Sequence, residues 1–375
     1  MEQLTFEKIK ALIGERKPTA NKGDNGRALI IAGSELMSGA ALMCAAAALR
    51  SGVGTLKAIV PNGARQAFYS VPECMCIAFG GEKWNELDEG FIAPYIAEAS
   101  AICVGPGMGK DSGVENTVRL ALAAKKPIVI DADGLNALSR IENIANVLHD
   151  KAILTPHIGE MARLTGLSTA YIKENQAEVA AKYAKQWGCT VLLKSCRSVI
   201  ACHDGQIALN TNGNSGLAKG GSGDVLSGIT LAMLSQGLEP FNAACAGAYT
   251  LGASADEAMR LHLARLAVRI AERYQGDALP RLCLINLNAP ALPVEQLKPL
   301  RIAPLSDAYY LDSYERRVSP HGDVYFWLES GLKIEPHKPG TDMALLNEGH
   351  ITCTFMGTLT DENAACAAKL QDLCI

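Results

Sequence analysis

The sequence has few charged and few aromatic residues, and it lacks a long apolar run. Charged residues make up 20% of the 375 residues and aromatic residues 5%, whereas hydrophobic residues reach 49%. This balance is typical of a folded protein and excludes a disordered chain. No apolar stretch approaches the ~20 residues of a membrane-spanning helix, and the first residues lack the basic and apolar segments of a signal peptide. We therefore expect no membrane partner.

The sequence also lacks a strong charge excess and a paired cysteine motif. The formal net charge is −4, which gives no electrostatic basis for binding nucleic acid or an anionic membrane. The 12 cysteines are scattered, none forms a C-x-x-C pair, and several lie inside apolar segments. Because there is no export signal, this distribution predicts reduced thiols and a cytoplasmic protein.

The composition changes near residue 260. Six of the 35 glycines but eight of the 16 prolines follow that position, and the aromatic residues are also denser there. A shift in three residue types at one place predicts a domain boundary, which we place within residues 258–263. The length agrees with one large domain, residues 1–258, followed by a smaller segment, residues 259–375.

Residues 1–258 repeat a short apolar run followed by a helical pattern. The runs are continuously apolar, which is typical of parallel strands that are buried on both faces. In such a sheet, ligands bind at the carboxyl ends of the strands. The predicted strands are residues 28–32, 55–60, 101–104, 127–130, 152–154 and 190–193, and polar or glycine residues follow several of them at 105–109, Asp131, Asp133, His157, Glu160 and Lys194.

The most informative segment is the glycine-rich stretch 212–228, which opens an apolar helical run at 229–234. Its glycines let backbone N–H groups converge, and a helix N-terminus adds partial positive charge. Asp224 falls in the first helical turn, where a carboxylate can take a proton from a hydroxyl that attacks a phosphoryl group. The simpler alternative is a tight turn with Asp224 as the helix cap. We favour an anion hole made by Gly220, Gly221, Ser222 and Gly223.

This segment resembles the signature of the ribokinase-like superfamily and, within it, the ADP-dependent NAD(P)H-hydrate dehydratases. Residues 214–228 match G-N-x-G-L-A-x-G-G-S-G-D-V-L-A-G, and residues 154–160 match L-T-P-H-P-G-E with Ile158 in place of proline. Residues 104–109 match V-G-P-G-L-G, and residues 130–138 match the D-A-D-A-L-N strand end. The motifs follow the family order over most of residues 1–258. The resemblance implies a three-layer α/β/α fold with a mostly parallel sheet.

The resemblance also implies an activity, a hydro-lyase reaction that serves metabolite repair. Family members use ADP, or ATP, to remove water from the S-epimer of NAD(P)H hydrate, by phosphorylating its hydroxyl and then eliminating it. Asp224 would be the base, and Mg²⁺ would neutralise the nucleotide phosphates, with Glu160 positioning the ion through water. The implied substrate contacts are Ala40, Gly105, His157 and Asp224, and the implied adenine-nucleotide contacts are Lys194, Ser195, Cys196, Arg197, Ser198 and Gly223.

Several alternatives remain open from the residues alone. His157 could be a polar group at the rim of the sheet, Lys194 a surface lysine, and the two aspartates after 130 could cap a turn. Ser195 stands where the family's K-G-x-x-T has glycine, which leaves the choice between ADP and ATP open. The glycine-rich turn also fits a ribokinase-like kinase of a vitamin-precursor alcohol, and NADH and NADPH hydrate are not distinguished.

Residues 259–375 follow a different pattern. They predict a helix at 260–274, strands at 282–290, 301–305 and 351–355, a helix at 343–348, and a hairpin of 309–318 with 323–328. L-x-N-x-N-x-P at 284–290 and G-T-D-x-x-A-L-x-x-G at 340–349, with Leu345 in place of alanine, resemble the C-terminal half of SurE-type survival-protein nucleotidases. That family's catalytic aspartates lie in its other half, so we expect a tail without nucleotidase activity.

The resemblance of the tail also bears on partners. In SurE-type proteins the hairpin exchanges between subunits, which implies a homo-oligomer, and the tail could serve assembly only or be a remnant that packs on its neighbour. In the dehydratase family an epimerase domain is often fused before the first strand, and no counterpart precedes Leu29 here. A separate NAD(P)H-hydrate epimerase is therefore a candidate partner.

Overall fold

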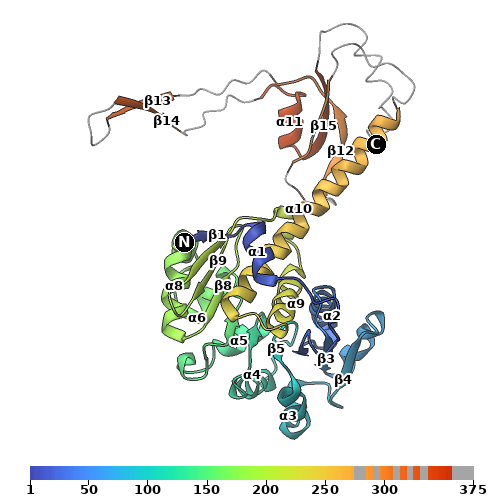
Figure 1. Ribbon diagram of the computed structural model, residues 1–375, viewed down its shortest axis with the longest axis vertical. Helices are drawn as coiled ribbons and strands as arrows, with labels where there is room; N and C mark the ends of the chain where they lie inside the picture. The colour runs from blue at the N-terminus through green and yellow to red at the C-terminus, as the bar shows by residue number, and fades with distance from the viewer. Residues whose placement is uncertain are drawn as a thin grey trace. The chain divides into compact units, whose positions relative to one another are not determined.

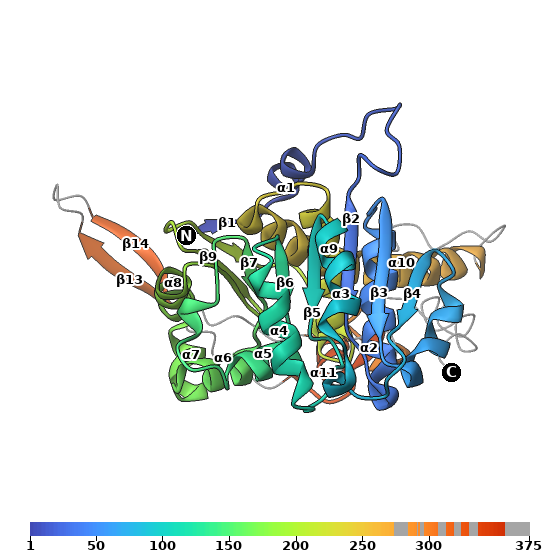
Figure 2. The same ribbon diagram turned by 90° about the horizontal axis from the view of Figure 1, so that it is seen from below.

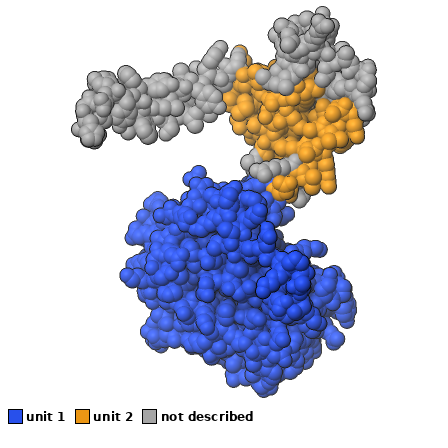
Figure 3. All heavy atoms as spheres, in the orientation of Figure 1, with its two compact units in different colours: residues 1–256 blue, residues 257–375 orange. Residues whose placement is uncertain are grey.

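The computed structural model describes residues 1–273, 284–290, 292, 296–306, 313–318, 324–329 and 337–356. The chain divides into two compact units, Met1–Asp256 and Glu257–Ile375 (Figure 3). The division falls inside one long helix, α10 (Pro240–Arg273), so no loop separates the units.

The first unit is built on a ten-stranded sheet (Figure 1). Strands β2 to β8 run parallel to one another, while β9 is antiparallel to both β8 and β10. The prediction of a mostly parallel sheet is therefore confirmed. In spatial order the strands are β1 (Glu2–Gln3), β10 (Ile207–Asn210), β9 (Ser198–Cys202), β8 (Thr190–Leu193), β7 (Ala152–Leu154), β6 (Ile128–Ile130), β5 (Ala101–Val104), β2 (Arg27–Ile31), β3 (Thr55–Val60) and β4 (Cys74–Ala78).

Helices cover both faces of this sheet and give the expected three layers (Figure 2). Along β2 the buried side chains alternate between two cores: Ala28 and Ile30 enter one, and Leu29 and Ile31 enter the other. This alternation is the period of a strand that is buried on both sides. The first core contains residues of α1 (Phe6–Ile13), α2 (Ser38–Arg50), α9 (Ser222–Ser235) and the start of α10; the second contains residues of α3 (Glu89–Glu98), α4 (Gly113–Ala123), α5 (Asp133–Leu138), α6 (Ile158–Thr165), α7 (Thr169–Glu174) and α8 (Gln176–Trp187).

The direction of the strand order reverses between β2 and β5. From β2 the chain adds β3 and β4 on one side, and then β5 to β8 on the other. Gly33 follows β2 and donates its N–H to Pro106 O at 2.8 Å, which ties together the loops after the two strands. In open α/β sheets a ligand binds at such a reversal, beyond the carboxyl ends of the strands.

The second unit is a small α+β structure, as expected. Its central strand β15 (His350–Met356) pairs antiparallel with β11 (Leu284–Asn288) and parallel with β12 (Lys298–Ile302). Leu266 and Ile270 of α10 pack with Leu300, Ile351 and Cys353 in its core. The unit also holds α11 (Asp342–Asn347) and the antiparallel hairpin of β13 (Ser313–Val318) and β14 (Val324–Glu329). The predicted hairpin turn at 319–322 lies outside the described residues.

Among the described residues, no helix has the combined length and apolarity required to cross a membrane. The cysteines of the described part of the chain are all free thiols, and most of them are buried.

Candidate active site at the carboxyl edge of the sheet

A buried ion pair lies beyond the carboxyl ends of β6 and β8. Lys194 Nζ lies 2.7 Å from Asp131 Oδ1, and Ser227 of α9 donates its hydroxyl to Asp131 Oδ2, also at 2.7 Å. The side chain of Asp131 is 1% exposed and that of Lys194 is 19% exposed. Burial opposes the charge of the lysine, but Asp131 and Glu160 outweigh it and raise the pKa of Lys194 above its ordinary value. Lys194 is therefore a partly buried cation and not a surface lysine.

The glycine-rich turn brings the start of α9 onto this pair. Gly221 is the N-cap of α9 with φ of 93°, a backbone conformation that favours glycine, and the end of the flexible Met43 side chain packs beside it. A Cβ on Gly223 would lie 3.4 Å from Lys194 Nζ and 3.6 Å from Asp131 Oδ2. The first N–H groups of a helix lack partners within the helix. The start of α9 therefore places backbone donors beside a lysine ammonium.

Asp224 lies in the first turn of α9. The interpretation of Asp224 as the helix cap is wrong, because the N-cap is Gly221 and no side chain caps the helix there. Burial raises the pKa of Asp224 to about 6, the charges of Asp131 and Asp133 raise it too, and Lys194 opposes them. A carboxylate with this pKa is ionised near neutral pH and can accept a proton.

His157 and Glu160 form a capping box at the start of α6. His157 Nδ1 accepts hydrogen bonds from the N–H groups of Gly159 at 2.9 Å and Glu160 at 3.2 Å, while Glu160 Oε2 accepts from the His157 N–H at 2.8 Å. Burial and the nearby Lys194 lower the pKa of His157, which favours the neutral ring. Because Nδ1 is an acceptor, the proton of the neutral ring lies on Nε2, in a side chain that is 54% exposed.

Glu160 was expected to position a magnesium ion. Its carboxylate is 7% exposed, it is used by the helix cap, and Lys194 Nζ lies 3.9 Å from it. Burial raises the pKa of Glu160 to about 7, and Lys194 acts against this. Within the described residues no cluster of three or more histidine, cysteine, aspartate or glutamate side chains could hold a metal ion. Glu160 therefore does not fit a direct metal ligand, and its role through water stays a prediction.

The loop after β5 packs closely against its neighbours. Gly105 has φ of 125°, and a Cβ there would lie 1.9 Å from the backbone oxygen of Asp131. A Cβ on Gly107 would lie 2.9 Å from the Cβ of Ala40 in α2. Gly109 donates its N–H to Asp133 Oδ2 at 2.8 Å, so Asp133 anchors this loop. Ala40 and Gly105 thus lie on the two sides of the strand-order reversal.

Five of the six expected nucleotide contacts lie in the turn between β8 and β9 or at the first residue of β9; they are Lys194, Ser195, Cys196, Arg197 and Ser198. The sixth, Gly223, lies in the first turn of α9. Ser195 Oγ lies 2.7 Å from Gln176 Oε1 and 2.8 Å from Arg197 O, and the Ser198 hydroxyl accepts from the Ser195 N–H at 3.3 Å. Ser195 therefore braces the turn from within. Cys196 and Arg197 are exposed at its tip.

Two contributors to the site were absent from the sequence predictions. Ser227 was not singled out, although its position three residues after Asp224 places both on one face of α9. Gln176 was not expected either, since it starts α8 and reaches Ser195 only through the fold.

The geometry can be compared with known proteins. The sequence profile of the NAD(P)H-hydrate dehydratase family matches residues 28–275. The chain belongs to this family. It is 39% identical over 262 residues to the bifunctional NAD(P)H-hydrate repair enzyme Nnr of Moorella thermoacetica, a match that covers 68% of this chain but 49% of the relative. The chain thus spans about half the length of such bifunctional relatives.

A shorter member of the dehydratase family matches over nearly its whole length. The ADP-dependent (S)-NAD(P)H-hydrate dehydratase of Bacillus subtilis is 33% identical, with 74% of this chain and 96% of the relative covered. The crystal structure of the Bacillus subtilis ADP/ATP-dependent enzyme, co-crystallised with ATP and Mg²⁺, matches with a TM-score of 0.58 at 31% identity and covers 74% of this chain and 91% of that one. The resemblance of the tail to SurE-type proteins stays a prediction.

Proposed function

We propose that the protein dehydrates the S-epimer of NAD(P)H hydrate with ADP or ATP as co-substrate. The observation that carries the proposal is the Asp224 carboxylate, with its raised pKa, beside the start of α9 and the Lys194–Asp131 pair. A base, a row of backbone donors and a cation are what phosphoryl transfer to a hydroxyl requires. The names of the related dehydratases support this reaction.

In the proposed reaction Asp224 takes the proton of the substrate hydroxyl as its oxygen attacks the terminal phosphoryl group of the nucleotide. The bond from that phosphorus to the bridging oxygen breaks. The N–H groups of Gly220, Gly221, Ser222 and Gly223 and the Lys194 ammonium stabilise the transferring group. The new O–P bond turns the hydroxyl into a phosphate ester. The C–O bond of this ester then breaks, phosphate leaves with the electron pair, and loss of a proton from the adjacent ring carbon to solvent restores the double bond.

Asp131 and Ser227 act as positioning residues in this proposal. Asp131 accepts from Lys194 and Ser227 with its two oxygens, so it holds the ammonium beside Gly223. Mg²⁺ is proposed to enter bound to the nucleotide phosphates, which are its preferred partners in such sites. The hydrated dinucleotide is assigned to Ala40, Gly105 and His157, and the adenine nucleotide to the turn of Lys194, Ser195, Cys196, Arg197 and Ser198.

The test is recovery of the near-ultraviolet absorbance of NADH or NADPH when its hydrate is mixed with the protein, once with ADP and once with ATP. Recovery with either nucleotide supports the proposal, and the comparison assigns the nucleotide and substrate. The alternative is a kinase of a vitamin-precursor alcohol. Absence of recovery, together with phosphorylation of a thiazole or pyrimidine alcohol, would replace the dehydratase by that kinase.

We also propose that the protein is a cytoplasmic homo-oligomer whose second unit makes subunit contacts. The support is the antiparallel hairpin β13–β14, because a two-stranded hairpin is marginally stable on its own. A chain that ends after Asp256 should form particles with fewer subunits, measured by light scattering, than the full chain forms. An equal number of subunits would exclude this role of the tail. Co-purification with a separate NAD(P)H-hydrate epimerase tests the remaining partner.

A further inference from the structure

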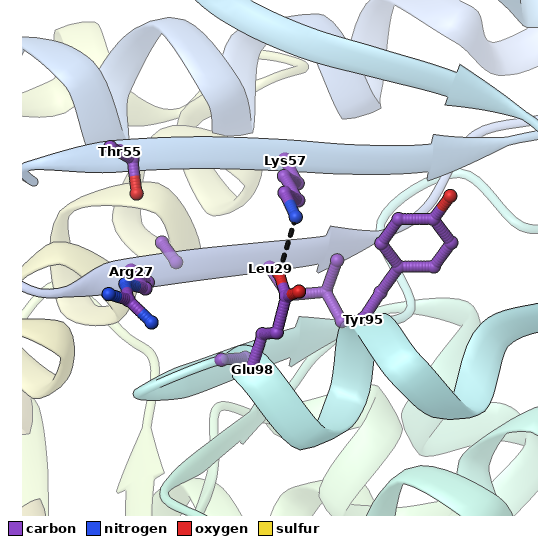
Figure 4. A pocket seen from close by; sticks show the side chains of 8 residues that line it. Arg27, Leu29, Thr55, Lys57, Tyr95 and Glu98 are labelled. Atoms are coloured by element: carbon purple, nitrogen blue, oxygen red, sulfur yellow. Dashed lines mark hydrogen bonds and ion pairs between the residues drawn. The ribbon is translucent and has the colours of Figure 1, made fainter.

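A polar pocket lies at the edge of the sheet opposite the candidate active site. It is a cavity of about 330 Å³ between the first residues of β2 and β3 and the last turn of α3, lined by Arg27, Leu29, Thr55, Lys57, Tyr95 and Glu98 among others (Figure 4). The candidate active site follows the carboxyl ends of the strands, whereas this pocket is at their amino ends. None of its lining residues belongs to the proposed dehydratase site.

The strand register places the cations of the pocket on one face. Arg27 pairs with Thr55, and Leu29 pairs with Lys57, so all four side chains point to the side of the sheet that α3 covers. The backbone of Arg27 is held at both ends by Ser100, which donates its N–H to Arg27 O at 2.8 Å and accepts from the Arg27 N–H at 3.1 Å. The base of the Arg27 side chain is therefore fixed.

The lysine of the pocket already has a partner. Lys57 Nζ lies 2.5 Å from Glu98 Oε2 and 5.2 Å from the centre of the Tyr95 ring. Figure 4 shows Arg27 and Thr55 on one side of this ion pair and Tyr95 on the other. Within the described part of the chain, the Arg27 guanidinium makes no hydrogen bond or ion pair. The charges of Arg27, Lys57 and Glu98 thus leave one positive charge unmatched.

The end of α3 would normally oppose an anion here, because the last carbonyls of a helix carry partial negative charge. In this structure Lys126 Nζ donates to Ala97 O at 2.5 Å and to Ala99 O at 2.6 Å. The Ala99 N–H lies within hydrogen-bonding distance of Tyr95 O and Ile96 O. The carbonyls at this helix end are therefore satisfied by a cation and a backbone donor, and the pocket keeps its positive character.

We propose that this pocket binds a small anionic metabolite through its carboxylate or phosphate group. The oxyanion lies between the Arg27 guanidinium and Lys57 and accepts from the Thr55 hydroxyl. Arginine holds such planar or tetrahedral oxyanions with two parallel hydrogen bonds, which a lysine cannot reproduce. Ligand pockets usually have volumes of about 300–1,000 Å³, so the cavity accepts a compact molecule and not a dinucleotide.

The test is binding of inorganic phosphate and of benzoate, measured by calorimetry on the full chain. Phosphate should occupy two sites, one in the anion hole and one here, and Arg27→Gln should weaken only the second by at least about tenfold. Arg27→Lys should also weaken it, since the charge remains but the paired donors are lost. Arg65→Gln, an exposed arginine in the segment that follows the carboxyl end of β3, is the matched control and should keep both sites.

The two probes separate the possible ligands. Benzoate that competes with phosphate for the Arg27-dependent site identifies a site open to carboxylates, whereas binding of phosphate alone identifies a site for phosphate esters. Binding of both probes that is unchanged in Arg27→Gln and Lys57→Met would overturn the proposal. Circular dichroism of each variant confirms the fold. The readout is independent of hydrate dehydration, so failure of the proposed function leaves the result intact.

Discussion

Two lysine–carboxylate pairs lie at opposite edges of the same sheet and differ mainly in burial. The Nζ–O distance is 2.7 Å for Lys194–Asp131 and 2.5 Å for Lys57–Glu98. The side chains of the first pair are 19% and 1% exposed, and those of the second are 28% and 56% exposed. Exposed pairs contribute little to stability, whereas removal of one partner from a buried pair leaves an uncompensated charge. The N–O distance alone therefore does not predict how much an ion pair contributes to stability.

The surroundings of the two pairs also differ. Asp131 lies near Asp224 and Glu160, and its charge raises the pKa of both carboxyl groups. At the amino edge, Lys57 and, to a smaller extent, Arg27 lower the pKa of Glu98, and no other carboxylate contributes to that shift. The carboxyl edge is suited to moving a proton, and the amino edge to holding an anion.

The largest expected effect is a loss of activity at the carboxyl edge without a loss of the fold. Asp224→Asn should lower kcat by about 10²–10⁴-fold, because the amide cannot accept the hydroxyl proton. The enzyme should keep its fold, since Asp224 caps no helix. Steady-state kinetics of hydrate dehydration measure the change, and Glu98→Gln at the other edge is the control with normal turnover. Near-normal kcat for Asp224→Asn would exclude the base role.

The second prediction tests whether burial determines the contribution of each ion pair to stability. Lys194→Met should destabilise the protein by about 3–5 kcal/mol in denaturant unfolding, because Asp131 would remain charged and buried without its cation. Lys57→Met is the matched change at the exposed pair and should leave the unfolding midpoint nearly unchanged. Equal losses of stability in the two variants would contradict the distinction between the edges.

Much of the central sheet could be predicted from the sequence. Strands β3, β5, β7 and β8 have the predicted bounds. The last three are fully buried runs, whereas β3 is fully buried only over its second half and has Thr55 and Lys57 near its start. Strands β9 and β10 were not predicted, although the dipeptide Asp204-Gly205 between them is a hairpin signal. Edge strand β4 was missed although it is a continuous apolar run, and the structure shows it to be only partly buried.

The partners within the site could not be predicted in the same way. Asp131 was left open between turn-capping and function, because its partners Lys194 and Ser227 lie 63 and 96 residues away along the chain. A local pattern contains no information on such pairs. His157 was expected to be either a rim residue or a substrate contact, and it is in fact a helix cap whose side chain is 54% exposed. The capping role and the exposure of His157 both depend on the three-dimensional surroundings of this one residue.

A third prediction concerns the hydroxyl that holds Asp131 in place. Ser227→Ala should cost about 1.5–3 kcal/mol of unfolding free energy, because a hydrogen bond to a buried carboxylate is lost. Thr230→Val on the same helix is the matched control. Its hydroxyl donates to the backbone oxygen of Leu226 at 2.8 Å, a neutral bond that should cost about 0.5–1.5 kcal/mol. A smaller loss for Ser227→Ala than for Thr230→Val would show that Asp131 does not depend on Ser227.

The smallest expected effect tests the coupling of charges at the carboxyl edge. A base with a pKa of about 6 predicts that kcat/KM rises with pH through about pH 6 and then levels off. Asp131 raises that pKa, so Asp131→Asn should shift the acid limb to lower pH by up to about one unit. The exposed Asp204, in the turn between β9 and β10, provides the control: Asp204→Asn should leave the limb in place. If the acid limb moves to higher pH in Asp131→Asn, the variant has lost the ordered Lys194 ammonium, and this loss raises the pKa of Asp224 more than the loss of the Asp131 charge lowers it. Asp131 would then act on Asp224 mainly through Lys194.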